Sequence, residues 1–210
     1  MKKLKKFFSI LNNIKFSASN SIRVKKGRSV KVYHKYNLSD VEIGDYSYIA
    51  PNSAISKTTI GKFCSIGPNF TCGTGIHPIT GISTSPMFYS TLMQNGMSLS
   101  LENKINERSK ILIGNDVFIG VNVTVLDGVT IGDGAIIGAG AIVSKDIPPY
   151  AIAIGCPVQI VKYRFSKETI EKLIQIKWWD FSEHDLINVE KYFFNLEDFI
   201  LRYEIAQRNR

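Results

Sequence analysis

The sequence is poor in the residues that build disulfide frameworks and metal sites. Its 210 residues include three cysteines and three histidines. The cysteines (Cys64, Cys72 and Cys156) show neither a CxxC motif nor metal-ligand spacing, and their odd number favours free thiols in a reducing cytoplasm. No stretch approaches the roughly 20 consecutive apolar residues that cross a bilayer. The length therefore predicts one globular domain, or one domain with an appendage.

Acidic residues are also in deficit, since 18 Asp and Glu face 26 Lys and Arg and leave a net charge of +8. Such a balance can indicate nucleic-acid binding, but part of the excess lies in two tails, at residues 2–6 and 202–210. The chain has no aromatic-plus-basic RNA motif, no helix-turn-helix pattern and no Walker-type phosphate loop. We therefore expect a basic surface that suits anionic small molecules, and no nucleic-acid partner.

What the chain does have is a repeat of six residues that runs without a slip from Ile113 to Val143. The first position of each unit is Ile or Val, the second is usually Gly, and the fifth is small or aliphatic. This period matches neither a helix nor an alternating strand, and it is typical of short strands separated by tight corners. First-position side chains should point into a narrow core, and glycine should serve the corners. The pattern predicts an all-β fold, a parallel β-helix.

The same register extends toward the N-terminus with one residue missing between Ile55 and Ile60. Cys64 takes the fifth position of its unit, which predicts a small buried thiol. Residues 41–165 are therefore assigned to the β-helix, and residues 1–40 to an N-terminal helix and strand segment.

Residues 1–15 form an amphipathic pattern, with lysines opposite an apolar face. The favoured interpretation is a short helix that packs on its own protein or on a neighbouring subunit. Peripheral membrane contact, at the inner face of the membrane, is the alternative. A signal peptide fits less well, because Asn12 and Asn13 interrupt the apolar stretch and no clear cleavage site follows.

Two segments depart from the repeat. Residues 73–110 form an excursion loop, and its closely spaced glycines and its aromatic residues favour a function. Residues 166–210 change to a helical period, with Ser166 as a candidate N-cap and with Ser182 and Asp185 in a capping-box pattern. We expect these C-terminal α-helices to cover an open end of the solenoid.

Several segments together resemble the hexapeptide-repeat acyltransferases, in the xenobiotic branch that contains the type B chloramphenicol and virginiamycin acetyltransferases. The resemblance covers residues 41 to 182 and rests on IGKFCSIGPNF, GIHP, IGNDVFIG, GVTIGDGAIIGAGAIVSKDIPPYAIAIGCPVQIVKYRF and IKWWDFS. The loop HPITGISTSPMFYS looks more like enzymes that acetylate sugars in surface-polysaccharide pathways. The resemblance implies a left-handed β-helix with three hexads per turn, an exception to the usual right-handed crossover. It also implies a homotrimer with acetyl-CoA, the acyl donor, bound between neighbouring subunits, and no metal.

In that family a loop histidine at the position of His77 is the general base. An unperturbed histidine, with a pKa of about 6.5, can take a proton from an acceptor hydroxyl or amine near neutral pH. Ser85, Met87 and Tyr89, further along the loop, are then expected to contact the acceptor. His34 and His184 are interpreted as structural or surface residues.

The resemblance also suggests the acetyl-CoA site. The backbone at Gly120 and Ala139 offers unobstructed partners for the pantetheine amides, and Ser144 stands where relatives carry a hydroxyl that contacts CoA. Cations for the adenosine phosphates are expected from the end of the stack, at Lys145, Lys162 and Arg164. Phe118 departs from the tryptophan usual in relatives, so a hydrogen bond from that indole is lost here.

The resulting expectation is transfer of an acetyl group to a hydroxyl or amine of a sugar, nucleotide sugar or glycan. The alternative enzyme function makes the acceptor an antibiotic such as chloramphenicol or a streptogramin. A zinc-dependent carbonic anhydrase on the same fold would need several histidines on the coils, and only His77 lies in the repeat region. A non-catalytic scaffold is disfavoured because His77 is present.

Overall fold

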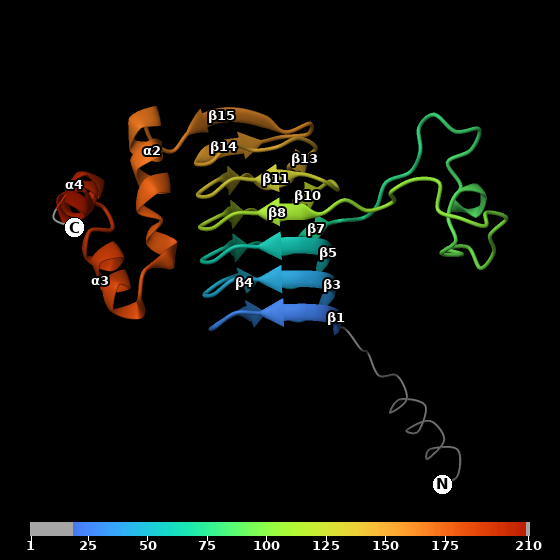
Figure 1. Cartoon of the computed structure of the whole chain (residues 1–210), viewed down its shortest axis with the longest axis horizontal. Coiled ribbons are helices and arrows are strands. Elements are labelled where there is room, and N and C mark those ends of the chain that lie inside the picture. The colour runs from blue at the N-terminus through green and yellow to red at the C-terminus, as the bar shows by residue number, and fades with distance from the viewer. Residues whose placement is uncertain (1–18, 209–210) are drawn as a thin grey trace, which may run out of the picture.

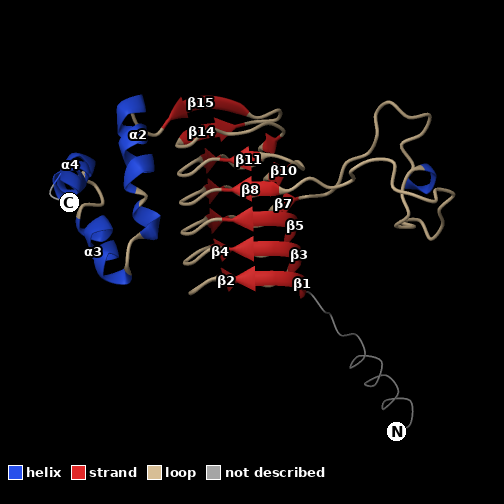
Figure 2. Cartoon of the chain, in the orientation of Figure 1, coloured by secondary structure: helices blue, strands red, loops and turns tan. Residues whose placement is uncertain are grey.

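The computed structural model describes residues 19–208, and they form a column of stacked coils with a projecting loop and a row of helices beside it (Figures 1 and 2). One parallel sheet runs in the order β1-β3-β5-β7-β10-β13, with β8 pairing with β5 and β11. The second sheet runs β15-β14-β12-β9-β6-β4-β2, and in it only the β14–β15 pair is antiparallel. The strands are β1 (Ser19–Lys26), β2 (Lys31–Val32), β3 (Tyr36–Ile43), β4 (Tyr48–Ile49), β5 (Ser53–Ile60), β6 (Ser65–Ile66), β7 (Thr71–Cys72), β8 (Ile111–Ile113), β9 (Phe118–Ile119), β10 (Thr124–Val125), β11 (Thr130–Ile131), β12 (Ile136–Ile137), β13 (Ile142–Val143), β14 (Ala151–Ile154) and β15 (Gln159–Tyr163).

The hexad repeat forms the core as predicted. Thr124 pairs with Ile142, and Phe118 pairs with Ile136, so each coil contains three hexads. The first and fifth positions of the units are all buried in one continuous core, at Ile113, Val117, Ile119, Val123, Val125, Val129, Ile131, Ala135, Ile137, Ala141 and Val143. This confirms the left-handed β-helix of the hexapeptide-repeat type.

The second-position glycines are required by close approach between coils. A Cβ on Gly114 would lie 2.6 Å from the Asp133 side chain, and one on Gly120 would lie 2.6 Å from the Ala139 nitrogen. Positive φ falls instead at the fourth position, where Asp116 (54°) adopts it. Asn122 adopts it too, and glycine takes this position at Gly128, Gly134 and Gly140. Asp and Asn tolerate this conformation better than other side chains, so they can replace glycine there.

The first coils are one residue shorter, which explains the missing residue between Ile55 and Ile60. Side chains that bond across neighbouring coils here are 17 residues apart, against 18 in the regular stack. In these coils a long strand takes the place of the shortened corner, and β1, β3 and β5 have eight residues each. β1 pairs with β3 from Ser19 to Lys26, so the described part of the column already includes residues 19–40, which the sequence register had left outside the β-helix.

The C-terminal segment has the helix starts that the sequence predicts. Thr169 N donates to the Ser166 side chain at 3.2 Å, and Asp185 N donates to the Ser182 side chain at 3.2 Å. The helices are α2 (Lys167–Ile176), the 3₁₀ turn η2 (Trp178–Asp180), α3 (Glu183–Lys191) and α4 (Leu196–Arg208).

These helices run along the side of the column, so the expectation that they cover an open end is wrong (Figure 1). Lys62 binds Asp180 at 2.8 Å, and Arg28, in a lower coil, binds Glu183 at 2.9 Å. The Phe63 ring, next to Lys62 in the sequence, lies 5.0 Å from the Trp178 ring. One corner of successive coils carries these aromatic and charged partners, and the helices pack against that corner because it offers contacts at several heights.

No helix within residues 19–208 is long and apolar enough to cross a membrane. The amphipathic pattern predicted over residues 1–15 lies outside the described residues.

The burial of the thiols generates the first prediction. Cys64 and Cys72 are buried in the core, where desolvation raises the pKa of each thiol to about 12, whereas Cys156 is exposed. Because the thiolate is the reactive form, Ellman's reagent should label one thiol per native chain and all three after unfolding in guanidinium. Rapid labelling of a second thiol in the native protein would contradict this packing.

Candidate functional site

The excursion loop leaves the column after β7, returns at β8, and projects on the side opposite the helices (Figure 1). It contains one 3₁₀ turn, η1 (Pro86–Phe88). At its base the two legs meet, with Ile76 N donating to the Glu107 carbonyl at 2.9 Å. Asp127, on the column, accepts from Gly75 N at 2.8 Å and from Ser109 N at 3.1 Å. The base of the loop is therefore held to the β-helix by backbone and carboxylate bonds.

His77 follows this base by two residues and is held by partners from the loop itself. Its Nδ1 lies 2.9 Å from the Thr84 carbonyl oxygen and 2.8 Å from the Tyr89 hydroxyl. The His77 and Tyr89 rings meet edge to face with their centroids 6.2 Å apart. His77 is exposed, whereas Tyr89 is buried, so one side of the imidazole is fixed and the other faces outward.

The Thr84 carbonyl selects the tautomer of the imidazole. A carbonyl oxygen can only accept a hydrogen bond, so Nδ1 of His77 must carry the hydrogen and donate it. In the neutral ring Nε2 is then unprotonated and has a free lone pair. The loop thus presents a histidine whose Nε2 can accept a proton from a bound molecule.

The three residues expected to contact an acceptor have different environments. Tyr89 bonds to His77, and burial followed by the charge of Glu107 raises its pKa, so it stays a neutral phenol beside the imidazole. Ser85 precedes η1, and the half-buried Met87 accepts from Leu99 N at 2.8 Å through its carbonyl. A mostly apolar pocket next to His77 is lined by Tyr89 but by neither of the other two; its walls are Pro78, Thr80, Gly81, Ile82, Ser83, Phe88, Tyr89, Lys104 and Ile105.

The residues expected to bind acetyl-CoA lie on the column. Gly120 and Ala139 are in direct backbone contact in neighbouring coils. Ser144 and Lys145 are exposed, and the Lys145 amine donates to the Gln159 side chain at 3.4 Å. Lys162 is exposed on β15. Ala139 is exposed as well, whereas Gly120 is buried and its N–H donates to the Ile137 carbonyl at 2.8 Å. The Gly120 amide is therefore not a free donor for pantetheine, contrary to the expectation from the sequence.

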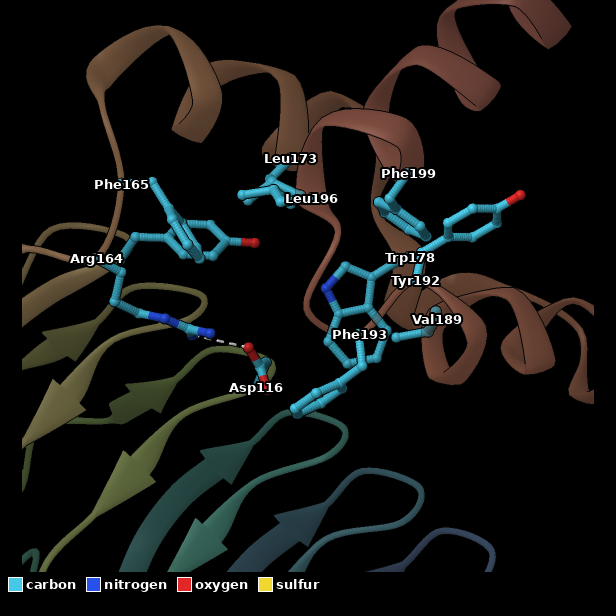
Figure 3. Close-up of a pocket in the computed structure, with 11 residues that line it drawn as sticks. Asp116, Arg164, Phe165, Leu173, Trp178, Val189, Tyr192, Phe193, Leu196 and Phe199 are labelled. Atoms are coloured by element: carbon cyan, nitrogen blue, oxygen red, sulfur yellow. Dashed lines mark hydrogen bonds and ion pairs between the residues drawn. The ribbon is translucent and has the colours of Figure 1, made fainter.

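Arg164 lies elsewhere, in a pocket between the column and the C-terminal helices (Figure 3). Its guanidinium donates to Asp116 at 2.9 Å and to the Gly134 carbonyl at 2.8 Å. It also lies over the Tyr150 and Phe165 rings, at 5.3 and 5.2 Å from their centroids. Burial raises the pKa of Asp116, and the bond from Arg164 opposes that shift. A side chain engaged in this way holds the helices to the column, which argues against its expected role at a CoA phosphate.

No signal in the sequence pointed to the Thr84 contact at His77 or to the Asp127 contacts at the base of the loop. The Thr84 partner is a main-chain carbonyl, which has no side-chain signature. Asp127 occupies the third position of a hexad, as Asp133 does, and nothing local in the sequence distinguishes the two. Within residues 19–208, no group of three or more His, Cys, Asp or Glu is placed to hold a metal ion.

A left-handed β-helix built from six-residue repeats and interrupted by a loop defines a protein of the hexapeptide-repeat class. Residues 110–145 match the family model described as bacterial transferase hexapeptide (six repeats). The chain is 35% identical over 153 residues to a chloramphenicol acetyltransferase from Agrobacterium fabrum, covering 70% of this chain and 69% of that one. It is 41% identical over 134 residues to a probable macrolide acetyltransferase from Lysinibacillus sphaericus, covering 63% and 74%.

A solved structure agrees with this assignment. A hexapeptide-repeat-containing acetyltransferase from Vibrio cholerae is similar with a TM-score of 0.53 at 25% identity, covering 67% of this chain and 73% of that one. The chain belongs to the hexapeptide-repeat acetyltransferases, and it is an acyltransferase.

Arg164 is bonded to Asp116, whereas Lys145 is exposed, and this difference leads to the second prediction. Arg164→Ala should lower the free energy of unfolding by about 1–3 kcal/mol, because it leaves the half-buried Asp116 carboxylate without its charged partner. Urea unfolding measures this loss, and calorimetry with CoA measures binding. Lys145→Ala, the control, should leave stability unchanged and weaken CoA binding. An Arg164→Ala protein of native stability with weakened CoA binding would reverse our assignment.

Proposed function

We propose that this protein transfers the acetyl group of acetyl-CoA to a hydroxyl or amine of a sugar, nucleotide sugar or glycan, with His77 as general base. The observation that carries the proposal is the pair of contacts at His77 Nδ1, which leaves Nε2 free to take a proton. Family membership supports acetyl transfer, and the three free thiols fit a cytoplasmic location.

The reaction needs no covalent enzyme intermediate. Nε2 of His77 takes the proton from the acceptor hydroxyl while the acceptor oxygen attacks the thioester carbon. The Thr84 carbonyl, which accepts from Nδ1–H, stabilises the imidazolium that forms. When the carbon–sulfur bond breaks, Nε2–H returns the proton to the departing thiolate. The products are the acetylated acceptor and free CoA, so every proton is accounted for.

The donor site is proposed along the last coils. The exposed backbone at Ala139 is offered to the pantetheine chain, and Gly120, whose N–H is bonded to the Ile137 carbonyl, leaves room beside it because it has no side chain. Ser144, Lys145 and Lys162 are exposed nearby and fit a phosphate-bearing nucleotide, since lysine ammonium groups bind phosphate as point charges. Arg164 is left out of this site because Asp116 and Gly134 occupy its guanidinium.

We also propose a homotrimer in which the excursion loop packs on a neighbouring subunit. Several loop side chains are apolar and almost fully exposed in the single chain, including Ile79 (95%) and Leu101 (99%). Several exposed apolar side chains on one loop usually mark a protein interface. A neighbouring column is a natural partner, because it would bring its CoA-binding coils to His77.

The antibiotic alternative has its own support, since the relatives above are described as chloramphenicol and probable macrolide acetyltransferases. We favour a sugar acceptor because the loop sequence from His77 to Ser90 resembles sugar-modifying enzymes more closely.

The third prediction concerns the base. His77→Ala should lower kcat about 100- to 10,000-fold, because the acceptor then loses its proton without assistance. Release of CoA is measured with a thiol reagent, using an acceptor that the wild type turns over. His184→Ala is the matched control, since this side chain is 94% exposed on α3, and it should retain full activity. Light scattering should give three times the 23.5 kDa chain mass for both variants. Unchanged turnover by the His77→Ala trimer would contradict the mechanism.

The fourth prediction concerns the acceptor. Mass spectrometry of products from acetyl-CoA with nucleotide sugars, lipid-linked glycans, chloramphenicol and a streptogramin should show acetylation of a sugar compound. The His77→Ala variant run in parallel identifies background transfer. A higher kcat/KM with an antibiotic than with any sugar would replace our proposal by the alternative.

A further inference from the structure

The corners of the column are held by a recurring bond from the third position of a hexad. In each case a side-chain oxygen accepts the backbone N–H one coil below. Asn115 accepts from Lys62 N at 2.9 Å, and Asp133 accepts from Asn115 N at 2.7 Å. Either an amide or a carboxylate serves, because one oxygen suffices.

Asp127 makes this bond and a second one that the others lack. Its Oδ1 accepts from Ser109 N, 18 residues earlier, as the recurring pattern requires. Its Oδ2 accepts from Gly75 N at 2.8 Å, on the outgoing leg of the excursion loop. One carboxylate therefore ties the two legs of the loop to the same corner of the column.

The bond to Gly75 lies two residues before His77, and it is placed to set the direction in which the loop leaves. Gly75 has a φ of 107°, a conformation that side chains rarely adopt, so the chain turns sharply at this amide. The next amide, Ile76 N, is bonded to Glu107 on the returning leg. Beyond Ile76, His77 is held only by Thr84 and Tyr89 among the described residues, and both belong to the same loop. A change in the direction of the outgoing leg would therefore displace the imidazole.

We propose that Asp127 is a positioning residue for acetyl transfer, which orients His77 through the Gly75 amide. The inference rests on the proposed function, in which His77 Nε2 takes the acceptor's proton. Asp127 itself does not touch the reacting atoms. Its effect is geometric, because a displacement of about 1 Å at a catalytic group can cost about 100-fold in rate.

Asp127→Asn separates the two roles of the carboxylate. The amide oxygen can still accept from Ser109 N, as Asn115 does from Lys62 N in the native chain. The amide nitrogen is a donor, so it faces the Gly75 N–H without a bond. The corner of the column is kept, and the outgoing leg loses its bond to the column. The bonds from Arg108 to the Gly73 carbonyl and from Ile76 N to the Glu107 carbonyl remain, so the loop stays attached while the constraint at Gly75 is removed.

Asp133→Asn is the matched control. Asp133 also occupies a third position, and both of its hydrogen bonds use one oxygen, from the Asn115 backbone and side chain. The substitution removes the same charge from a neighbouring hexad without touching the excursion loop.

We expect Asp127→Asn to lower kcat about 10- to 100-fold, with the KM for acetyl-CoA changed less than twofold. Hydrogen exchange should be at least about tenfold faster at Gly75 and unchanged at Ser109 and in the coils. Asp133→Asn should match the wild type in all of these. Wild-type kcat, an equal loss in Asp133→Asn, or unchanged exchange at Gly75 in Asp127→Asn would overturn the inference.

A spectroscopic measurement makes failure of this inference distinguishable from failure of the proposed function. In protein labelled with ¹⁵N-histidine, the ring signals of native His77 should show the single Nδ1–H tautomer, with His34 and His184 as internal references. Asp127→Asn should average the His77 signals, and Asp133→Asn should not. If the wild type acetylates no acceptor, the proposed function fails while these spectra still decide whether Asp127 orients His77.

Discussion

The structure depends on backbone hydrogen bonding between successive coils. Each coil donates and accepts backbone hydrogen bonds along its edges. Neighbouring coils must therefore follow nearly the same backbone path. That requirement explains why first- and fifth-position side chains from Ile113 to Val143 are small or aliphatic, and why a Cβ at Gly114 or Gly120 would collide with the next coil. It also explains why one shortened corner is copied through the first coils, where β1, β3 and β5 share the same length.

A stack bound in this way offers a rigid surface and little chemistry of its own, since its repeated side chains serve the core. Function can be added only where the repeat is interrupted or at its corners. In the proposed function the excursion loop uses the first option: it carries His77, whose Nδ1 lies 2.9 Å from the Thr84 carbonyl oxygen. The C-terminal helices use the second and pack along one corner through ion pairs at Asp180 and Glu183. The two additions lie on opposite sides of the column (Figure 1).

Arg164 shows how a motif can mislead when its surroundings are unknown. In the sequence it follows Lys162 on the last strand and looks like a third cation for a phosphate. In the folded chain it turns toward Asp116 and the aromatic wall of the helices (Figure 3). Arg164 follows the end of β15, so the strand does not hold it on the same face as Lys162, two residues earlier. Its contacts are decided by the packing of the helices against the column.

The sequence by itself determined the β-helix, the buried positions of its hexads, the bounds of the excursion loop and the helix N-caps at Ser166 and Ser182. These features are readable because each is decided within a few residues, and every coil repeats the same environment. Only the tertiary structure decided where the helices pack, which nitrogen of His77 is free, and that Asp127 joins the two legs of the loop. Those contacts link segments without a shared period, and one is a main-chain carbonyl, so no local pattern encodes them.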